Sequence, residues 1–408
     1  GVVAAEQLRK LDPLSNVTII GAEPEPPYSR MAIPYFLTDK IAEDGTYLRK
    51  TDQHYQTRKI DVVNKRVQSI DTDMNRVITD DGESYRYDKL LLATGASPSV
   101  PPISGIDSPG VHNCWTLEDA RSIIKLANPG ASVVLLGAGF IGCIVLEALA
   151  LRDVKLTVVE MENRMVPRMM NDVSGNMIKR WCEHKGVAVH TSTRAESVEQ
   201  IGDGKLKVSL SGGQSVEADL VITATGVKSN MQYAQDSGLK TDQGVLVNEY
   251  LQTSNEDIYA AGDVCQGKDF STGEYTVQAI QPTAVEHAKV AAGNMVRGHR
   301  SEHAGNVNMN VLDTIGLVSA SFGSWMGVEG GESAELLNEE DFKYLNLQFR
   351  DDVLVGASSL GLTQHVGVLR GLIQSQTPLG EWKDRLLKDP MRVMEAYLAC
   401  AQAQAEPA

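Results

Sequence analysis

The sequence predicts an α/β fold in which one Rossmann-like dinucleotide-binding domain is inserted into another, followed by a C-terminal α+β domain. Three observations predict it. The glycine-rich segment 137–142 lies between an apolar, strand-like run and a helical stretch. A strand ending in Ala-Thr-Gly at 93–95 is repeated at 224–226, which indicates two related units. After about residue 306 the pattern changes to short runs typical of antiparallel strands.

The chain opens on a dinucleotide-binding unit that lacks its first strand. Leu8 and Leu11 share one helical face, and the buried-strand run 17–20 ends just before Glu23. In this setting Gly1 is the third glycine of a dinucleotide motif, and Glu23 is its ribose-binding acid. We therefore expect the native polypeptide to begin earlier, with a short strand and a Gly-x-Gly turn. A domain that starts with this helix is the alternative.

The unit at 137–142 has all of its parts. An apolar run leads into Gly137, which permits the tight turn; Gly139 lets the backbone approach a pyrophosphate, and Gly142 lets the helix pack on the strand. The helix that begins at Phe140 and Ile141 offers N–H groups and a partial positive charge to the diphosphate.

The acidic residue of this unit predicts which nucleotide it binds. Glu160 lies 18 residues after Gly142, at the end of the next strand, where a carboxylate accepts hydrogen bonds from both ribose hydroxyls. A carboxylate there repels a 2′-phosphate, so we expect NAD(H) to be preferred to NADP(H). The nearby Arg164 could weaken this preference for NAD(H), but we expect its effect to be secondary to that of Glu160.

Between and after these units the pattern continues in order. Short strands are predicted at 60–63, 67–70 and 76–78. Residues 257–263 form a strand that runs into Gly262 and Asp263, and a helix follows over 282–295 with Pro282 near its start.

The C-terminal region is predicted to combine antiparallel strands with helices. The strands are expected at 311–312, 315–318, 344–349 and 353–357, with a hairpin turn at Arg350-Asp-Asp. Helices are expected at 369–373 and 382–401. The apolar positions of the last helix either dock a partner or pack in the core.

Charge and composition exclude several classes of partner. The 408 residues carry a net charge of −15 with no basic run, so we expect neither nucleic acid nor a membrane as a partner. No signal peptide and no bilayer-length apolar run is present, which favours a cytoplasmic protein. The five cysteines lack metal-ligand spacing, so we expect reduced thiols, no metal site and no iron–sulfur cluster in this chain.

As an ordered set, these segments resemble the FAD-dependent pyridine nucleotide–disulfide oxidoreductases. The matching segments are Pro-Tyr-Ser-Arg at 27–30, Ala-Thr-Gly-Ala at 93–96, the glycine motif at 137–142, Ala-Thr-Gly at 224–226 and Ala-Ala-Gly-Asp at 260–263. The resemblance covers about residues 1–300 and implies FAD in the first domain and NAD(H) in the inserted one. We expect an FAD domain over 1–112 and 241–305, an NAD domain over 113–240 and an interface domain over 306–408.

The resemblance also implies the residues of each site. For FAD they are Gly1, Glu23, Arg30, Ala93, Thr94, Gly95, Gly262, Asp263, Pro282, Thr283 and Ala284. For NAD they are Gly137, Gly139, Phe140, Ile141, Gly142, Glu160 and Gly226. Glu23 would hold the adenosine ribose, Arg30 would lie near the FAD phosphates, and Asp263 would bind the ribityl chain or phosphate. No catalytic acid or base is expected, because hydride transfer between stacked rings depends on position.

The departures from the family narrow the expected chemistry. Met31 stands where disulfide-active members carry a redox cysteine, and no CxxxxC pair is present, so disulfide reductase activity is not expected. Tyr35 and Ile144 replace the lysine and glutamate that pair beside the flavin in many ferredoxin-reducing members. His287, His365 and Trp325 either line the acceptor side of the flavin or pack in the core.

The function expected from this resemblance is that of an FAD-dependent NAD(H) oxidoreductase that exchanges single electrons with an iron–sulfur partner. Short segments, including 31–35, resemble NADH-linked flavin subunits of multi-subunit enzymes such as phenylglyoxylate dehydrogenase and the tungsten-containing aldehyde oxidoreductases. The chain would then be the NAD-reducing subunit of an aldehyde or oxoacid oxidoreductase. The alternatives are a free-standing NADH oxidase or diaphorase and a non-catalytic FAD/NAD-binding assembly or sensor protein.

Overall fold

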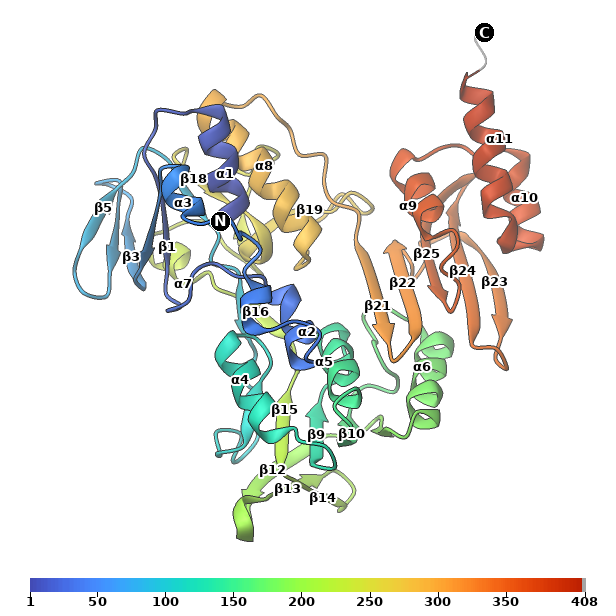
Figure 1. Cartoon of the computed structure of the whole chain (residues 1–408). Helices are drawn as coiled ribbons and strands as arrows, with labels where there is room; N and C mark the ends of the chain where they lie inside the picture. The colour runs from blue at the N-terminus through green and yellow to red at the C-terminus, as the bar shows by residue number, and fades with distance from the viewer. Residues whose placement is uncertain (406–408) are drawn as a thin grey trace. The chain divides into compact units, whose positions relative to one another are not determined.

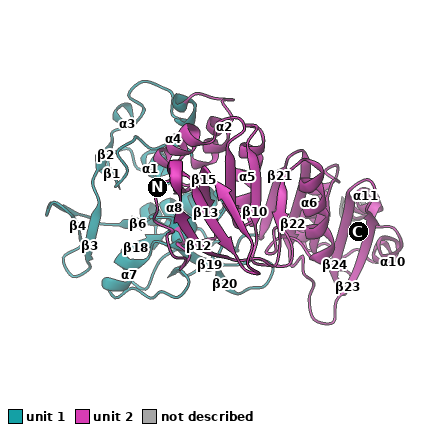
Figure 2. Cartoon of the chain, turned by 90° about the horizontal axis from the view of Figure 1, so that it is seen from below, with its two compact units in different colours: residues 1–29, 43–97, 227–306 teal, residues 30–42, 98–226, 307–408 magenta. Residues whose placement is uncertain are grey.

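The structure is a computed structural model that describes residues 1–405. The chain separates into two compact units, shown in different colours in Figure 2. Unit 1 comprises residues 1–29, 43–97 and 227–306, and unit 2 comprises residues 30–42, 98–226 and the chain from 307 onward. The four-segment division predicted at residues 112, 240 and 305 stays a prediction. Within the described part of the chain, no helix is both long and apolar enough to cross a membrane.

Unit 1 contains two pairs of parallel strands and two helices packed together. Strand β1 (Val17–Gly21) pairs with β2 (Ile60–Asn64), and β6 (Leu90–Leu92) pairs with β18 (Ile258–Ala260). Helix α1 (Val2–Leu11) lies beside α8 (Gln281–Arg297) (Figure 1). Ala4, Ala288 and Ala292 form the contact, and these small side chains let the two helices approach closely. The helices predicted at the start of the chain and at 282–295 are thus confirmed.

The rest of unit 1 is made of small sheets and short helices. The antiparallel sheet β3 (Val67–Asp71), β4 (Arg76–Thr79) and β5 (Ser84–Arg86) confirms the strands predicted at 67–70 and 76–78. A second sheet joins β17 (Val245–Leu246), β19 (Cys265–Lys268) and β20 (Tyr275–Val277), and β7 (Ala96–Pro98) pairs with β16 (Val227–Ser229). The short helices are η2 (Glu43–Thr46), α3 (His54–Thr57), α7 (Gln232–Asp236) and η4 (Gly262–Val264).

Unit 2 contains a five-stranded parallel sheet whose strand order reverses in the middle. The order is β11 (Ala188–His190), β10 (Lys155–Val159), β9 (Ser132–Leu136), β15 (Leu220–Thr223) and β8 (Val111–Asn113). From β9 the chain builds β10 and β11 on one side, and then β15 on the other. The carboxyl ends of β9 and β15 therefore meet at a topological switch point, where open α/β sheets bind ligands.

Helices and a smaller sheet accompany this parallel sheet. The helices are α4 (Leu117–Leu126), α5 (Phe140–Ala150) and α6 (Asp172–His184), together with η1 (Arg30–Ala32) and α2 (Ile33–Leu37), which contacts α4 and α5. The antiparallel sheet consists of β12 (Ala195–Gln200), β13 (Leu206–Leu210) and β14 (Ser215–Ala218), with η3 (Gly202–Gly204) between β12 and β13.

The C-terminal part of unit 2 is an antiparallel sheet with helices, as predicted. The strand order is β21 (Met309–Thr314), β22 (Leu317–Gly323), β25 (Val353–Leu360), β24 (Lys343–Arg350) and β23 (Glu332–Asn338). Arg350 pairs with Val353, which confirms the two-residue turn between them. The helices are α9 (Val366–Ser375), α10 (Glu381–Lys388), η5 (Pro390–Arg392) and α11 (Val393–Ala405).

In this region one prediction was wrong and one strand was missed. The continuous helix expected over 382–401 is two helices, because Pro390 lacks an N–H and forces Asp389 into an extended conformation. Strand β23 was not predicted. It is an edge strand in which Ala334 alone is fully buried, so its polar sequence has no clear alternation.

Candidate functional site

The glycine turn after β9 lies directly against the end of β15 in unit 2. Gly137 has φ +101°, and a Cβ atom there would lie 2.5 Å from the carbonyl oxygen of Ala224. A Cβ at Gly142 would lie 2.2 Å from the Gly137 oxygen. At Gly139 the same atom would meet nothing within 4 Å. Gly137 and Gly142 thus permit close packing, whereas Gly139 leaves space beside the backbone for a ligand.

The N-terminus of α5 is open. Gly139 is its N-cap residue and no side chain accepts from its first N–H groups, whereas Thr116 and Asn171 cap α4 and α6 in the same unit. Phe140 and Ile141 form the first turn of α5. Such a terminus is suited to a diphosphate, because its N–H groups and the helix dipole both favour an anion.

The Glu160 carboxylate is fixed beside this turn. It is 7% exposed; its Oε2 accepts the N–H of Ala138 at 2.6 Å and its Oε1 accepts the N–H of Glu162 at 2.8 Å. Each carboxylate oxygen can accept a second hydrogen bond, so Glu160 retains an acceptor position for each of two ribose hydroxyls. Gly226, which follows β15, has φ +109° and open space where a Cβ would be.

In unit 1, the backbone and side chain of Asn230 together hold the turn of residues 93–95. Thr94 Oγ1 donates to the Asn230 carbonyl at 2.8 Å, and Asn230 Nδ2 donates to the Thr94 carbonyl at 2.9 Å. The Asn230 backbone N–H donates to Gly95, which has φ +67° and open space at its Cβ position. Gly1, the N-cap of α1, lies near Ala93, with 3.8 Å between its Cβ position and the Ala93 Cβ. Asn230 was not singled out from the sequence, because no motif marks it.

The turn at Gly262 lies against the start of α8. Gly262 has φ +77°, and a Cβ there would lie 3.2 Å from the Cβ of Ala284. Ser229 Oγ donates to the Asp263 carbonyl at 2.7 Å. Pro282 occupies the first turn of α8, Thr283 is buried, and no side chain caps this helix. A second open helix N-terminus is therefore present in unit 1, beside α1.

A buried histidine pair lies behind the Gly262 turn. The Gly262 N–H donates to Nδ1 of His287 at 3.4 Å, and the rings of His287 and His303 meet edge to face at 4.8 Å. Burial and the neighbouring His303 lower the pKa of His287 to about 4. The ring is thus neutral near pH 7 and can accept from Gly262. Trp325 is buried and His365 is half-buried, and both belong to unit 2. Whether His287, Trp325 and His365 line the flavin or pack in the core stays a prediction.

Glu23 and Arg30 have partners of their own. Glu23 follows β1 and accepts the hydroxyl of Tyr28 at 2.5 Å. Arg30 belongs to unit 2, where its Nη1 donates to the Trp115 carbonyl at 2.6 Å and its guanidinium lies over the Trp115 ring. Their predicted roles at the ribose and phosphates of FAD stay predictions.

The residues of unit 1 fit a dinucleotide with a negatively charged centre. The N-termini of α1 and α8 lack side-chain caps, so their first N–H groups are available to an anion. Gly95 and Gly262 have no side chain, so a ligand can approach the backbone of the turns in which they lie. Among the described residues, no group of three or more His, Cys, Asp or Glu side chains could hold a metal ion.

None of the cysteines is an activated thiol. Burial raises the pKa of Cys114, Cys182 and Cys265 to about 12, and it raises the pKa of Cys143 and Cys400 as well. Met31 and Tyr35, by contrast, are 49% and 54% exposed in unit 2. The exposed side chain at position 31 is therefore a thioether, which cannot act as a nucleophilic thiolate.

Comparison with known proteins agrees with this arrangement. A profile of the pyridine nucleotide-disulphide oxidoreductases matches residues 1–293. Subunit epsilon of the NADH-dependent phenylglyoxylate dehydrogenase of Aromatoleum evansii is 32% identical over 393 residues, which are 96% of this chain and 93% of that protein. An NADH oxidase of Methanocaldococcus jannaschii is 34% identical over 304 residues, 72% of this chain and 67% of that protein.

The solved structures show the same fold. Putidaredoxin reductase, in its covalent complex with putidaredoxin, matches with a TM-score of 0.90 over 99% of this chain and 96% of that one, at 23% identity. The fold, the glycine turns and the sequence relatives lead to one conclusion. This chain belongs to the pyridine nucleotide-disulphide oxidoreductase family and is an NAD(H)-dependent flavoprotein oxidoreductase whose cofactors are FAD and NAD(H).

Proposed function

We propose that this chain is the NAD-reducing subunit of a multi-subunit aldehyde or oxoacid oxidoreductase and exchanges single electrons with an iron–sulfur partner. The observation that carries the proposal is the extent of its likeness to the phenylglyoxylate dehydrogenase subunit. That likeness covers 96% of this chain and 93% of the subunit, so it includes the C-terminal sheet and helices. The NADH oxidase likeness covers only 72% of this chain.

The thiols support an acceptor outside the chain. Disulfide or persulfide chemistry needs a low-pKa, accessible cysteine, whereas burial raises the pKa of all five cysteines and the exposed position near the start of α2 is Met31. When bound, FAD links a two-electron donor to one-electron carriers. Because the cysteines show no cluster-binding spacing, we place the one-electron carrier on another chain.

The part of the protein in this reaction is to bind the two dinucleotides and to orient them relative to each other. The open N-terminus of α5 and the Glu160 carboxylate would bind the diphosphate and adenosine ribose of NAD(H). The turns at Gly95 and Gly262, with the N-termini of α1 and α8, would bind FAD and place a positive helix end near its negatively charged groups. No side chain has to move a proton for a hydride to pass between aligned rings.

The test measures how fast the FAD-loaded full chain passes electrons from NADH to each of two acceptors, a one-electron dye and oxygen. We expect NADH to reduce a one-electron dye such as ferricyanide rapidly while oxygen consumption in air stays slow. The native complex, purified without oxygen, should also contain iron in subunits that copurify with this chain in fixed proportion. Slow dye reduction by a fully FAD-loaded chain would contradict the proposal.

A second candidate is a free-standing NADH oxidase. It is favoured by the 34% identity to the Methanocaldococcus jannaschii protein of that name. This candidate predicts rapid NADH consumption by the isolated chain in air, with oxygen as the acceptor. A chain that binds FAD and NADH yet shows no flavin reduction would instead indicate a non-catalytic assembly or sensor protein.

A further inference from the structure

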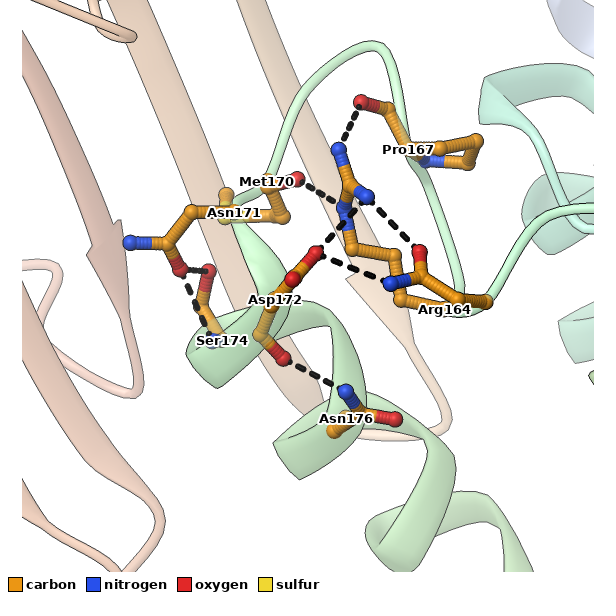
Figure 3. Close-up of polar contacts among 8 residues, drawn as sticks. Arg164, Pro167, Met170, Asn171, Asp172, Ser174 and Asn176 are labelled. Atoms are coloured by element: carbon orange, nitrogen blue, oxygen red, sulfur yellow. Dashed lines mark hydrogen bonds and ion pairs between the residues drawn. The ribbon is translucent and has the colours of Figure 1, made fainter.

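The loop that follows Glu160 is organised by Arg164 (Figure 3). Arg164 donates from Nε to the Met170 carbonyl at 2.8 Å and from Nη2 to the Pro167 carbonyl at 3.1 Å. Its Nη1 donates to Asn163 Oδ1 and to Asp172 Oδ1, both at 2.8 Å. A guanidinium has five N–H groups, so most of the donors of Arg164 are used within this loop.

The same loop is attached to the glycine turn through Ala138. Glu160 accepts the N–H of Ala138, and the carbonyl of Ala138 accepts the N–H of Val166 at 2.8 Å. Val166 is 1% exposed and has φ +43°, a conformation that strains a β-branched residue. Its own carbonyl accepts the N–H groups of Met169 and Met170. Such strain persists only where the surroundings hold the residue in place, and Arg164 bridges the two ends of this segment.

Arg164 packs against Gly175 of helix α6, where the absence of a side chain leaves space for it. A Cβ atom at Gly175 would lie 3.0 Å from both Cβ and Cδ of Arg164 and 2.7 Å from the Met165 carbonyl oxygen. A side chain at position 175 would therefore displace Arg164 or the loop. Asp172, in the first turn of α6, supplies the charge that pairs with Arg164.

We propose that Arg164 is a positioning residue for the nicotinamide dinucleotide: it locks the 161–171 loop onto Ala138 and so holds Glu160 where it discriminates NADH from NADPH. Because Asp172 and three further acceptors engage its guanidinium, Arg164 does not offer its charge to a 2′-phosphate. The arginine thereby supports the carboxylate's preference instead of weakening it. This inference rests on the placement of NAD(H) at the 137–142 turn.

The test uses two ligands that bind without reacting, ADP-ribose and 2′-phospho-ADP-ribose, titrated by calorimetry into the FAD-loaded full chain. We expect Arg164→Lys to weaken ADP-ribose binding about tenfold, since it keeps the charge but loses the fork of hydrogen bonds. Binding of 2′-phospho-ADP-ribose should change much less, so the discrimination between the two ligands falls. The kcat with saturating NADH should change less than its KM.

Arg168 gives the matched control. It is an exposed cation in the same loop. Arg168→Lys and Arg168→Met therefore change the size and the charge of a loop side chain while the hydrogen bonds of Arg164 stay in place. Gly175→Ala, which perturbs the same contact from α6, should act in the same direction as Arg164→Lys. FAD content and the melting temperature show which variants are folded, and Asp172→Asn serves if an arginine variant is not.

The outcomes separate the inference from its premise. Unchanged discrimination in folded Arg164→Lys and Asp172→Asn, or an equal loss of affinity for both ligands, would overturn the positioning role. If Glu160→Gln also leaves both affinities unchanged, the fault lies in the placement of the nucleotide. If Glu160→Gln alters discrimination while the Arg164 variants do not, the site stands and the role of the arginine is wrong.

Discussion

At the scale of single residues, we propose that the Glu160 carboxylate determines the choice of nucleotide. Glu160→Gln should lower kcat/KM for NADH and raise it for NADPH, so that their ratio shifts by about tenfold or more. An amide no longer repels a 2′-phosphate, and its NH2 group cannot accept the N–H of Ala138 or Glu162. Initial rates with both nucleotides check this. Glu162→Gln, at an exposed side chain in the same loop, is the control and should leave the ratio unchanged.

The His287–His303 pair makes stability depend on pH. Burial lowers the pKa of His287 from 6.5 to about 4, and it lowers the pKa of His303 although Glu286 opposes this effect. Well above pH 6.5 both imidazoles are neutral in the folded and the unfolded chain. As the pH falls toward 4, the unfolded chain binds protons first, so the folded state loses on the order of 3 kcal/mol through His287.

This prediction is checked by urea unfolding of the FAD-loaded chain between pH 7 and pH 4. His287→Gln retains a hydrogen-bond acceptor for Gly262 but has no titrating ring. Its stability should fall less steeply with acidification than that of the parent chain. Equal slopes in the two proteins would show that another group dominates this pH range.

Sequence reasoning identified residues that belong to local motifs and missed those that act through tertiary contacts. The glycines at 137, 139 and 142 and Glu160 are marked by spacing along the chain, and the structure brings them together at one strand end. Asn230 is 136 residues from Thr94, so no local pattern links them. Arg164 was noticed for its charge, but its partner Asp172 lies across a loop that the sequence does not specify.

At the scale of elements, helix α6 connects the parallel sheet with the C-terminal antiparallel sheet inside unit 2. Asn171 caps α6 by accepting the N–H of Ser174 at 3.0 Å, and its Nδ2 donates to the Tyr344 hydroxyl of β24 at 2.6 Å. Trp181 of α6 donates from its indole to the Ile315 carbonyl at 3.1 Å. The helix that carries Asp172 is therefore hydrogen-bonded to the C-terminal sheet through Asn171 and to the turn between β21 and β22 through Trp181.

Asn171→Ala should remove the three hydrogen bonds of that side chain, two with Ser174 and one with Tyr344. We expect a loss of about 2 kcal/mol in the free energy of unfolding, from the helix cap and from the buried Tyr344 hydroxyl left without this partner. Chemical denaturation measures it. Asn176→Ala, at a half-buried position in the same helix, is the control and should cost far less. Equal losses in the two variants would show that Asn171 does not join these elements.

Elements were predictable where burial imposes a period. The buried strands β9 and β15 and the helix α8 follow apolar patterns that the sequence displays directly. The edge strand β23 and the break between α10 and α11 were missed for opposite reasons. In β23 the burial is too slight to impose alternation, and at Pro390 a helical apolar pattern continues across a residue that ends the helix.

At the scale of the whole molecule, the order of motifs along the chain predicted the family, and the family profile over residues 1–293 confirms it. The arrangement of the units is a product of long-range contacts: unit 1 is assembled from three separate stretches and unit 2 from three others. Pattern reading locates the motifs in such a chain but does not specify which stretches pack together.

The most direct test of the central claim is anaerobic stopped-flow mixing of the FAD-loaded full chain with NADH, and separately with NADPH, while flavin absorbance is followed. We predict rapid bleaching by NADH and much slower bleaching by NADPH, because the Glu160 carboxylate disfavours the 2′-phosphate. Subsequent addition of a one-electron acceptor should restore the absorbance. A fully loaded chain whose flavin is not bleached by either nucleotide would contradict the account.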